Sequence, residues 1–348
     1  MSDPVRLSLA AVHALAMQVL RAHGVSDAHA RAIADTITAA ERDDCKSHGL
    51  FRLPGYLSSV RSGKVTPDAV PEVHELAPAI VQVDGKNGFA PLALQIGRAP
   101  LAEKARQYGI AALAVTRIYH FAALWPEVEA LAGEGLVALA FTAARSYVAP
   151  AGGSKPLYGT NPMAFAWPRA GHPPLVFDQA SSASARGEIQ LHLRDGRPIP
   201  AGWALDAAGQ PTTDPAAALA GAQLPFGGYK GAAIALMIEL LAGALIGEVL
   251  SFEAAAQDNH DGGPPGGGEL MIAIDPVRCV GHGNRQQQLA HAEQLFANIL
   301  AQEGTRLPSD RRYAARQRTP REGVTIPRAL YDELQHADER RDAHGANG

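Results

Sequence analysis

The chain has 348 residues, 47% of them hydrophobic and 19% charged, which is a globular composition long enough for two domains or for one with a large excursion. Its formal net charge of -4 argues against a nucleic-acid partner, because neutralising phosphates requires a clustered excess of lysine and arginine. Cys45 and Cys279 are the only cysteines, which excludes a disulfide framework and a four-thiolate zinc site and favours a reducing cytoplasm.

The N-terminal fifth of the chain has the apolar spacing of helices. Helices are predicted over residues 7–23 and 27–42, with Ser26 or Asp27 capping the second. The stretch "RLPGYLSSVRSG", residues 52–63, indicates a further short helix. We therefore expect this part of the chain to be helical.

From about residue 72, short apolar runs alternate with glycine-rich turns, and helices are predicted over residues 90–109 and 284–303. The runs typical of strands are residues 79–85, 109–116, 136–142, 163–168, 175–181 and 269–276. This alternation predicts an α/β protein with a central sheet flanked by helices.

The most apolar stretch, residues 231–250, has nearly the length of a membrane span. Glu239 and Glu248 lie within it and would be costly in lipid, so a helix packed inside a protein is the better interpretation. The chain's opening is interrupted by His13 and Gln18, which argues against a signal peptide. We expect no membrane association.

Common cofactor and metal motifs are missing from the sequence. No G-x-G-x-x-G lies between a strand and a helix, and no G-x-x-x-x-G-K-[ST] is present. The glycine-rich stretch at residues 262–268 is interpreted as a surface loop because of its prolines. No H-E-x-x-H or other convincing ligand spacing occurs among the 13 histidines, so we predict no metal.

The stretch "ERDDCKSHGLFRLPGY", residues 41–56, places a hydroxyl, an imidazole and a guanidinium close together in Ser47, His48 and Arg52. If residues 48–52 are helical, His48 and Arg52 share one face and could act on one small molecule. A surface turn at a helix end is the simpler interpretation of this stretch alone. A hydrolase is disfavoured because the sequence has no G-x-S-x-G elbow.

Five further segments accompany this stretch, and each alone has an ordinary structural explanation. They are residues 119–129, 159–168, 177–189, 225–231 and 306–312. Together with SHG-x-x-R and GTNP, their order resembles the malate/L-lactate dehydrogenase family that lacks the Rossmann fold, over about residues 7–335. Within that family, "HFAALWPEVE" and "ARGEIQLHLRDG" look like the branch that reduces cyclic ketimines with NADPH.

The resemblance implies a fold and a domain plan. A nicotinamide-binding domain of non-Rossmann type should be joined by a helical domain formed from both chain ends, in a cytoplasmic homodimer. The expected divisions are an N-terminal helical part of the substrate and dimer domain at 1–75, the NADPH-binding domain at 76–275, a C-terminal helical return at 276–335 and a flexible tail at 336–348. The active site should lie in the cleft between the domains.

The resemblance also implies catalytic and substrate-binding residues. His48 matches the proton donor, Ser47 its relay neighbour, and Arg52 the residue that holds the substrate carboxylate through paired hydrogen bonds. Thr160 resembles a second substrate contact, and Glu188 is the candidate carboxylate that orients the imidazole. An imidazole that titrates near neutrality is suited to donating a proton and regaining it from water.

The expected cofactor is NADPH (NADP+), because the paired arginines near residue 311 suit the 2'-phosphate, although Asp310 beside them could instead accept a ribose hydroxyl bond. The implied cofactor-binding residues are His120, Phe121, Ala122, Ala123, Leu124, Asp178, Gln179, Ala180, Arg186, Gly187, Tyr229, Lys230, Ser309, Asp310, Arg311 and Arg312.

The expected reactions convert Δ1-piperideine-2-carboxylate to L-pipecolate and Δ1-pyrroline-2-carboxylate to L-proline. The alternative is an NAD(P)-dependent 2-hydroxy-acid dehydrogenase of malate or lactate type that uses the same residues on a ketone. A non-catalytic binding protein would leave the pairing of His48 with Arg52 unexplained.

Overall fold

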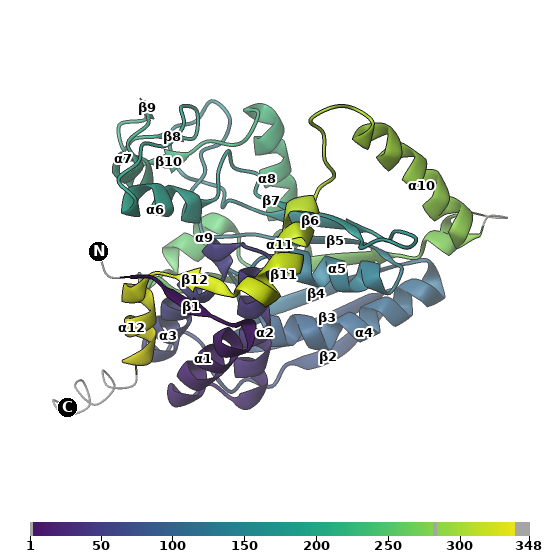
Figure 1. The fold of residues 1–348 in the computed structure, drawn as a ribbon, viewed down its shortest axis with the longest axis horizontal. Coiled ribbons are helices and arrows are strands. Elements are labelled where there is room, and N and C mark those ends of the chain that lie inside the picture. Colours follow the sequence, from purple (N-terminus) through teal and green to yellow (C-terminus); the bar gives the residue numbers. More distant parts are fainter. Residues whose placement is uncertain (1–2, 281–283, 338–348) are drawn as a thin grey trace.

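The two ends of the chain lie side by side (Figure 1). The computed structural model describes residues 3–280 and 284–337. In it, strand β1 (Val5–Leu7) pairs antiparallel with β12 (Val324–Ile326). The sequence reasoning predicted neither strand, and most of the predicted tail at 336–348 lies outside the described residues.

Helices from both ends pack around a shared apolar core. They are α1 (Leu9–Ala22), α2 (Asp27–Arg42), α3 (Leu53–Arg61) and α12 (Arg328–Gln335). The helices predicted at 7–23, 27–42 and 52–63 are thus confirmed. The hydroxyl of Ser26, rather than Asp27, caps α2 by accepting a hydrogen bond from the His29 amide at 3.4 Å.

The central element is a seven-stranded sheet in the order β2-β3-β4-β11-β5-β6-β7. Its strands are β2 (Glu72–Ala77), β3 (Ile80–Phe89), β4 (Ile110–Tyr119), β5 (Val137–Thr142), β6 (Met163–Trp167), β7 (Leu175–Gln179) and β11 (Gly266–Ile274). Only β3 and β4 run parallel, so the sheet differs from the parallel sheet of a Rossmann domain. All six predicted strands are present, whereas β2 was missed.

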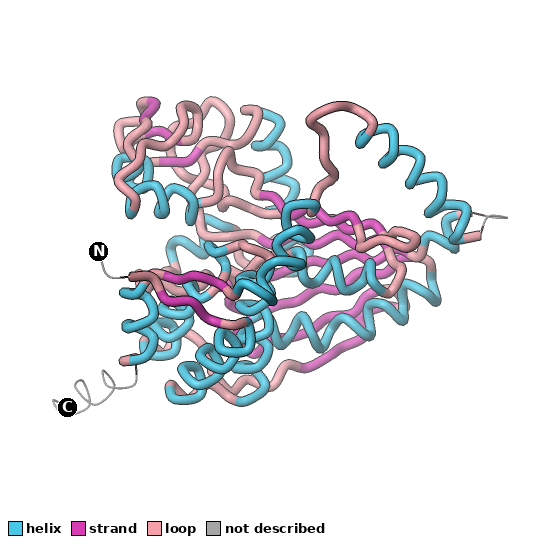
Figure 2. The backbone as a smooth tube through the Cα atoms, in the orientation of Figure 1, coloured by secondary structure: helices cyan, strands magenta, loops and turns pink. Residues whose placement is uncertain are grey.

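Helices cover both faces of this sheet (Figure 2). Helices α4 (Ala90–Tyr108) and α5 (Trp125–Gly133) pack on one face and enclose the largest apolar core. Gly97 lets α4 approach closely, because a side chain there would collide with Leu113 of β4. The α/β prediction, with helices flanking a sheet, is therefore confirmed.

The opposite face carries α8 (Tyr229–Ala242). Tyr229–Ile246 is the one stretch of the described chain that is long and apolar enough to cross a membrane by length and composition. Its Glu239 is buried, and the carboxylate accepts hydrogen bonds from the Asn161 amide at 2.8 Å and the Ser251 backbone at 2.9 Å. These bonds satisfy a carboxylate inside the protein, as expected for a core helix.

A smaller unit, which the sequence reasoning missed, follows β7. It contains a three-stranded sheet and two helices around Ile189 and Ile199 (Figure 1). Its elements are α6 (Arg186–Arg194), β8 (Ala204–Leu205), β9 (Pro211–Thr212), α7 (Pro215–Ala220) and β10 (Ala222–Gln223). This unit directs the first turn of α6 toward the cavity described below.

The remaining helices are α9 (Ser251–Ala256), α10 (Arg285–Leu300) and α11 (Asp310–Glu322). Helix α10 confirms the helix predicted over 284–303 and extends on the side away from the chain ends (Figure 1). Helix α11 is fixed to the body of the protein by Arg316, which forms ion pairs with the buried Asp43 and with Glu129. The C-terminal segment thus contacts α2 and α5.

Candidate active site

A cavity of about 270 Å³, called the main cavity below because it collects most of the predicted site residues, brings together segments far apart in sequence. Nine of the predicted site residues line it, namely Ser47, His48, Arg52, His120, Phe121, Ala122, Thr160, Arg186 and Gly187. The remaining lining residues include Arg145, Tyr147, Gln190, Gly262, Gly263 and Pro265.

The segment with His48 and Arg52 is not one continuous helix. It forms two 3-10 turns, Lys46–His48 and Leu50–Arg52, which are separated at Gly49. A side chain at Gly49 would collide with the Glu41 carboxylate, which accepts a hydrogen bond from the Leu50 amide at 2.8 Å. The expected helical spacing was wrong, but the break still leaves both side chains lining one cavity.

His48 is paired with its neighbour. The Ser47 hydroxyl lies 3.0 Å from Nδ1 of His48. Burial lowers the pKa of His48 to about 3, and the positive charge of Arg52 acts in the same direction. The imidazole is thus neutral near neutrality without ligands, which differs from the expectation of an imidazole that titrates there.

Arg52 presents a cation to the same cavity. Its guanidinium lies over the Phe121 ring at 5.0 Å, and its Nε has no hydrogen-bond partner among the described residues. The first turn of α6 packs against it, since a side chain at Gly187 would lie 3.4 Å from the Arg52 guanidinium. An arginine with an unused donor beside a helix N-terminus suits a carboxylate ligand.

Two further arginines make this wall of the cavity strongly basic. The Tyr147 ring has Arg186 over it at 3.9 Å and Arg145 at 4.9 Å. Arg186 donates to the Leu219 carbonyl at 3.1 Å, and Arg145 pairs with Asp258. The sequence reasoning missed Arg145 and Tyr147, although polar residues directly after strand β5 are a usable signal.

Thr160 reaches the cavity from the GTNP turn. Its carbonyl accepts hydrogen bonds from the Ser181 amide at 2.8 Å and the Ser181 hydroxyl at 3.0 Å. The next residue, Asn161, is buried with a positive φ of 34° and fixes the turn by accepting from the Ala144 amide at 3.1 Å. The turn is therefore rigidly attached to the segment after β5.

Some residues of the segment after β4 line the cavity, and others are buried in the core. His120, Phe121 and Ala122 line the cavity, whereas Ala123 and Leu124 are buried in the large core. Asp178, also predicted to bind cofactor, accepts hydrogen bonds from the backbone amides of Leu124 at 2.8 Å and Trp125 at 3.1 Å. Its carboxylate thereby caps the N-terminus of α5.

A series of hollows continues from the main cavity. Ala185 lines both the main cavity and a neighbouring hollow formed with Gln179 and Ala180. Ala183 is shared between that hollow and a further one, which Tyr229 lines. The exposed Lys230 follows Tyr229 at the start of α8. The three spaces thus form a series that runs from the main cavity to the start of α8.

The glycine-rich stretch at 262–268 is not simply a surface loop. Gly262, Gly263 and Pro265 line the main cavity, and residues from Gly266 onward begin the central strand β11. The backbone is held close to α3, because a side chain at Gly263 would collide with Ser59. The prolines end before the strand begins, so they do not prevent pairing.

The predicted residues at the start of α11 lie beside β7. Ser309 exchanges hydrogen bonds with the Val176 backbone, and Asp310 accepts from the Leu307 amide at 2.8 Å. Arg312 donates to the Val176 carbonyl at 3.0 Å and lies over the Trp125 ring. Arg311 is exposed.

Glu188 does not line the main cavity. It lies in the first turn of α6, 46% exposed, with its carboxylate 3.8 Å from Nε2 of His192. A role in orienting His48 stays a prediction.

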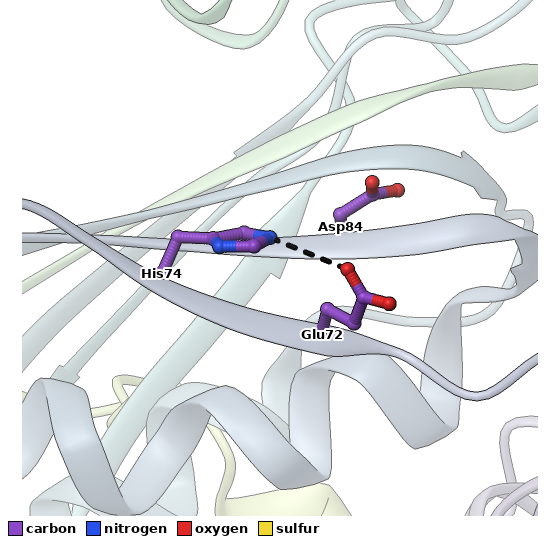
Figure 3. A group of neighbouring side chains, drawn as sticks. All are labelled: Glu72, His74 and Asp84. Carbon is purple, nitrogen blue, oxygen red and sulfur yellow. Dashed lines mark ion pairs between the residues drawn. The ribbon is translucent and has the colours of Figure 1, made fainter.

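The described residues contain one group of three potential metal ligands, Glu72, His74 and Asp84, on β2 and β3 (Figure 3). Lys86 lies 2.9 Å from the Glu72 carboxylate and 3.4 Å from that of Asp84, and Arg117 also pairs with Asp84. Because these cations already neutralise both carboxylates, the group supports no metal site.

Known proteins resemble this chain over nearly its whole length. The profile of a family described as malate/L-lactate dehydrogenase matches residues 7–335. A Δ1-pyrroline-2-carboxylate/Δ1-piperideine-2-carboxylate reductase of Pseudomonas aeruginosa is 56% identical over 95% of this chain and 98% of its own. A Δ1-pyrroline-2-carboxylate reductase of Ancylobacter novellus is 55% identical over 96% and 98%. The crystal structure of a Δ1-piperideine-2-carboxylate reductase from Pseudomonas syringae has a TM-score of 0.89, with 44% identity over 96% of this chain and 99% of that one.

Proposed function

The chain belongs to the malate/L-lactate dehydrogenase family, and from this we propose that it is an oxidoreductase that reduces Δ1-pyrroline-2-carboxylate and Δ1-piperideine-2-carboxylate to L-proline and L-pipecolate. The observation that carries the proposal is the 56% identity to a reductase named for both imines, over 95% of the chain. The cavity with Ser47, His48 and Arg52 supports it, since its chemistry suits a carboxylate next to a C=N bond.

The substrate carboxylate binds Arg52 and the first turn of α6, which places the C=N bond beside His48. The bound carboxylate offsets the positive charge that disfavours the imidazolium, so the pKa of His48 rises and it donates a proton to nitrogen. A bound reduced nicotinamide supplies the hydride to carbon. Thr160, which also lines the cavity, completes the substrate contacts.

The cofactor of this proposal is NADPH, bound along the hollows lined by Gln179, Ala180 and Tyr229. The exposed Arg311 meets the 2'-phosphate, whereas Arg312 supports it by holding α11 to Val176. Loss of a charge-assisted contact costs about 1.5 to 3 kcal/mol. We therefore expect Arg311→Ala to reduce the preference for NADPH over NADH about 10-fold or more.

Steady-state kinetics with NADPH and NADH measure that preference. Arg318→Ala is the matched control, since Arg318 lies on the same helix and pairs with Asp44 and Glu322 instead. A wild-type enzyme that uses NADH equally well would refute the choice of cofactor.

The proposed assembly is a homodimer. Helix α8 and its surroundings expose a band of large apolar side chains, Leu236, Met237, Leu240, Leu245 and Phe252, which are 38% to 66% exposed. Apolar patches of this kind commonly mark protein contacts. A dimeric molar mass in solution that Leu240→Asp converts to that of one chain would support this surface, and a monomeric wild type would refute the dimer.

The two unpaired cysteines, Cys45 and Cys279, support a cytoplasmic location for the enzyme. Fractionation of the native host would test that location.

The decisive experiment for the proposed activity compares catalytic efficiencies for Δ1-piperideine-2-carboxylate, Δ1-pyrroline-2-carboxylate, oxaloacetate and pyruvate. We expect both imines to be reduced much more efficiently than either keto acid. A protonated imine is neutralised by hydride, so no developing alkoxide has to be stabilised. A ratio in favour of oxaloacetate would assign the enzyme instead to 2-hydroxy acids.

A further inference from the structure

A buried group of titratable side chains lies behind the wall of the main cavity. His120, at the end of β4, is 7% exposed, and Glu269 of β11 is fully buried, with Nδ1 of the imidazole 3.5 Å from a carboxyl oxygen. Among the described residues, both nitrogens of His120, both carboxyl oxygens of Glu269 and one of Glu127 have no hydrogen-bond partner. Buried polar groups rarely lack hydrogen-bond partners, so this group of residues suggests a function.

The charges around Glu269 favour a carboxyl group that keeps its proton. Burial raises the pKa of Glu269 well above its usual range, and the neighbouring carboxyls of Glu127 and Asp178 raise it further. Burial lowers the pKa of His120 to about 4, so this imidazole is neutral near neutrality. Both shifts therefore favour the form of the pair in which Glu269 carries the proton and the imidazole is neutral.

The other groups that act on this pair come from several elements. Asp178 of β7 accepts hydrogen bonds from two backbone amides at the start of α5, and the positive charge of Arg312 of α11 favours its ionised form. The positive charge of Arg98 of α4 opposes the rise in the pKa of Glu127. His120 and His48 of the 3-10 turn both line the main cavity, and a charge on His120 would lower the pKa of His48. Only Glu269 and Glu127 combine a raised pKa with unused carboxyl oxygens.

Glu127 connects this group to a second cavity. That cavity has a volume of about 180 Å³ and lies on the α4 and α5 side of the sheet, where Asp35, Gln95 and Arg98 also line it. Glu127 interacts with Glu269 and burial raises its pKa as well. The order of groups from the second cavity to the first is therefore Glu127, Glu269, His120 and His48.

We propose that Glu269 stores the proton consumed in imine reduction and passes it through His120 to His48, while Glu127 resupplies Glu269 from the second cavity. The proposal rests on the proposed function. The Glu269 carboxyl protonates Nδ1 of His120, His120 releases the proton on its other nitrogen toward His48 across the cavity that both line, and His48 protonates the imine nitrogen. That nitrogen takes the electron pair of the C=N π bond as hydride from the reduced nicotinamide forms the C–H bond. Glu269 then regains a proton, through Glu127, from water.

Glu269→Gln tests this storage, because the amide has the shape of the carboxyl group but has no acidic proton to give. We expect kcat for the imines to fall about 10- to 100-fold with KM changed less than about twofold. The wild-type rate should fall as the pH rises through the raised pKa of Glu269, and this decline should be absent in Glu269→Gln. A purely structural role would not remove that decline.

Infrared spectra of the full chain give a readout without substrate or cofactor. The C=O band of protonated carboxyl groups at neutral pH should lose intensity in Glu269→Gln and in Glu127→Gln. Glu129→Gln is the matched control on α5: the Glu129 carboxylate pairs with Arg316 instead, so this variant should leave the band and the rate unchanged.

Wild-type kcat in Glu269→Gln, or an unchanged carboxyl band, would overturn the relay. If Glu269→Gln does not fold, Glu127→Gln supplies both readouts, and a wild-type rate and band there would likewise overturn it. A wild type that reduces no imine would refute the proposed function instead, while the infrared band would still report whether Glu269 holds a proton.

Discussion

Replacing His48 with alanine is expected to lower kcat for cyclic imines by about 100- to 10,000-fold, the usual contribution of general acid catalysis. The imidazole lines the cavity with Arg52 and is held by the Ser47 hydroxyl at 3.0 Å. Its removal takes away the group next to the reacting nitrogen without removing the carboxylate clamp. The loss should therefore appear in kcat more than in KM.

The fold should tolerate this change. His48 is the last residue of a short turn and does not belong to an apolar core, so the melting temperature and cofactor binding of the variant should stay near those of the wild type. His74→Ala is the matched control, because His74 is exposed on the edge strand β2 and should leave turnover unchanged. Near wild-type turnover in His48→Ala would assign the imidazole a structural role only.

The central strands could be predicted from sequence because they are buried, and burial selects continuous apolar runs. Strand β2 has no such run, since nearly all of its residues are exposed at the edge of the sheet. Strands β1 and β12 are three residues each and pair across almost the entire chain, which local periodicity cannot reveal. The short strands around α7 escaped prediction for the same reason of length.

Whether a site residue could be predicted depends on whether it belongs to a motif. Ser47, His48, Arg52 and Thr160 lie in recognisable motifs and all reach one cavity. Asp178 was selected by its motif too, but its carboxylate caps α5 instead of lining that cavity.

Other residues belong to no motif and were missed. Arg145 and Tyr147 follow strand β5 and reach the cavity through the tertiary fold. Glu269 did carry a signal, because a carboxylate at the head of the apolar run "ELMIAI" has to be buried with its strand. What the sequence could not show is that this carboxylate faces His120 from the neighbouring strand.

Arg52→Lys is expected to lower kcat/KM by about 30- to 150-fold, equal to about 2 to 3 kcal/mol, for imines and keto acids alike. Both substrate classes carry the carboxylate that Arg52 holds, whereas the bond that is reduced differs. Lysine keeps the charge but loses the planar pair of donors and the stacking of the guanidinium on Phe121 at 5.0 Å. The burial that lowers the pKa of Arg52 would act more strongly on a lysine.

The measurement is the ratio of efficiencies for Δ1-piperideine-2-carboxylate and oxaloacetate in the wild type and in Arg52→Lys. The ratio should stay constant while both efficiencies fall, because the clamp contributes equally to either substrate. Arg61→Lys, on the exposed surface of α3, is the matched control and should change neither. An unimpaired Arg52→Lys would mean that another cation of the cavity holds the carboxylate, and Arg145 and Arg186 beside Tyr147 are then the residues to replace, since they supply the remaining guanidinium groups of that wall.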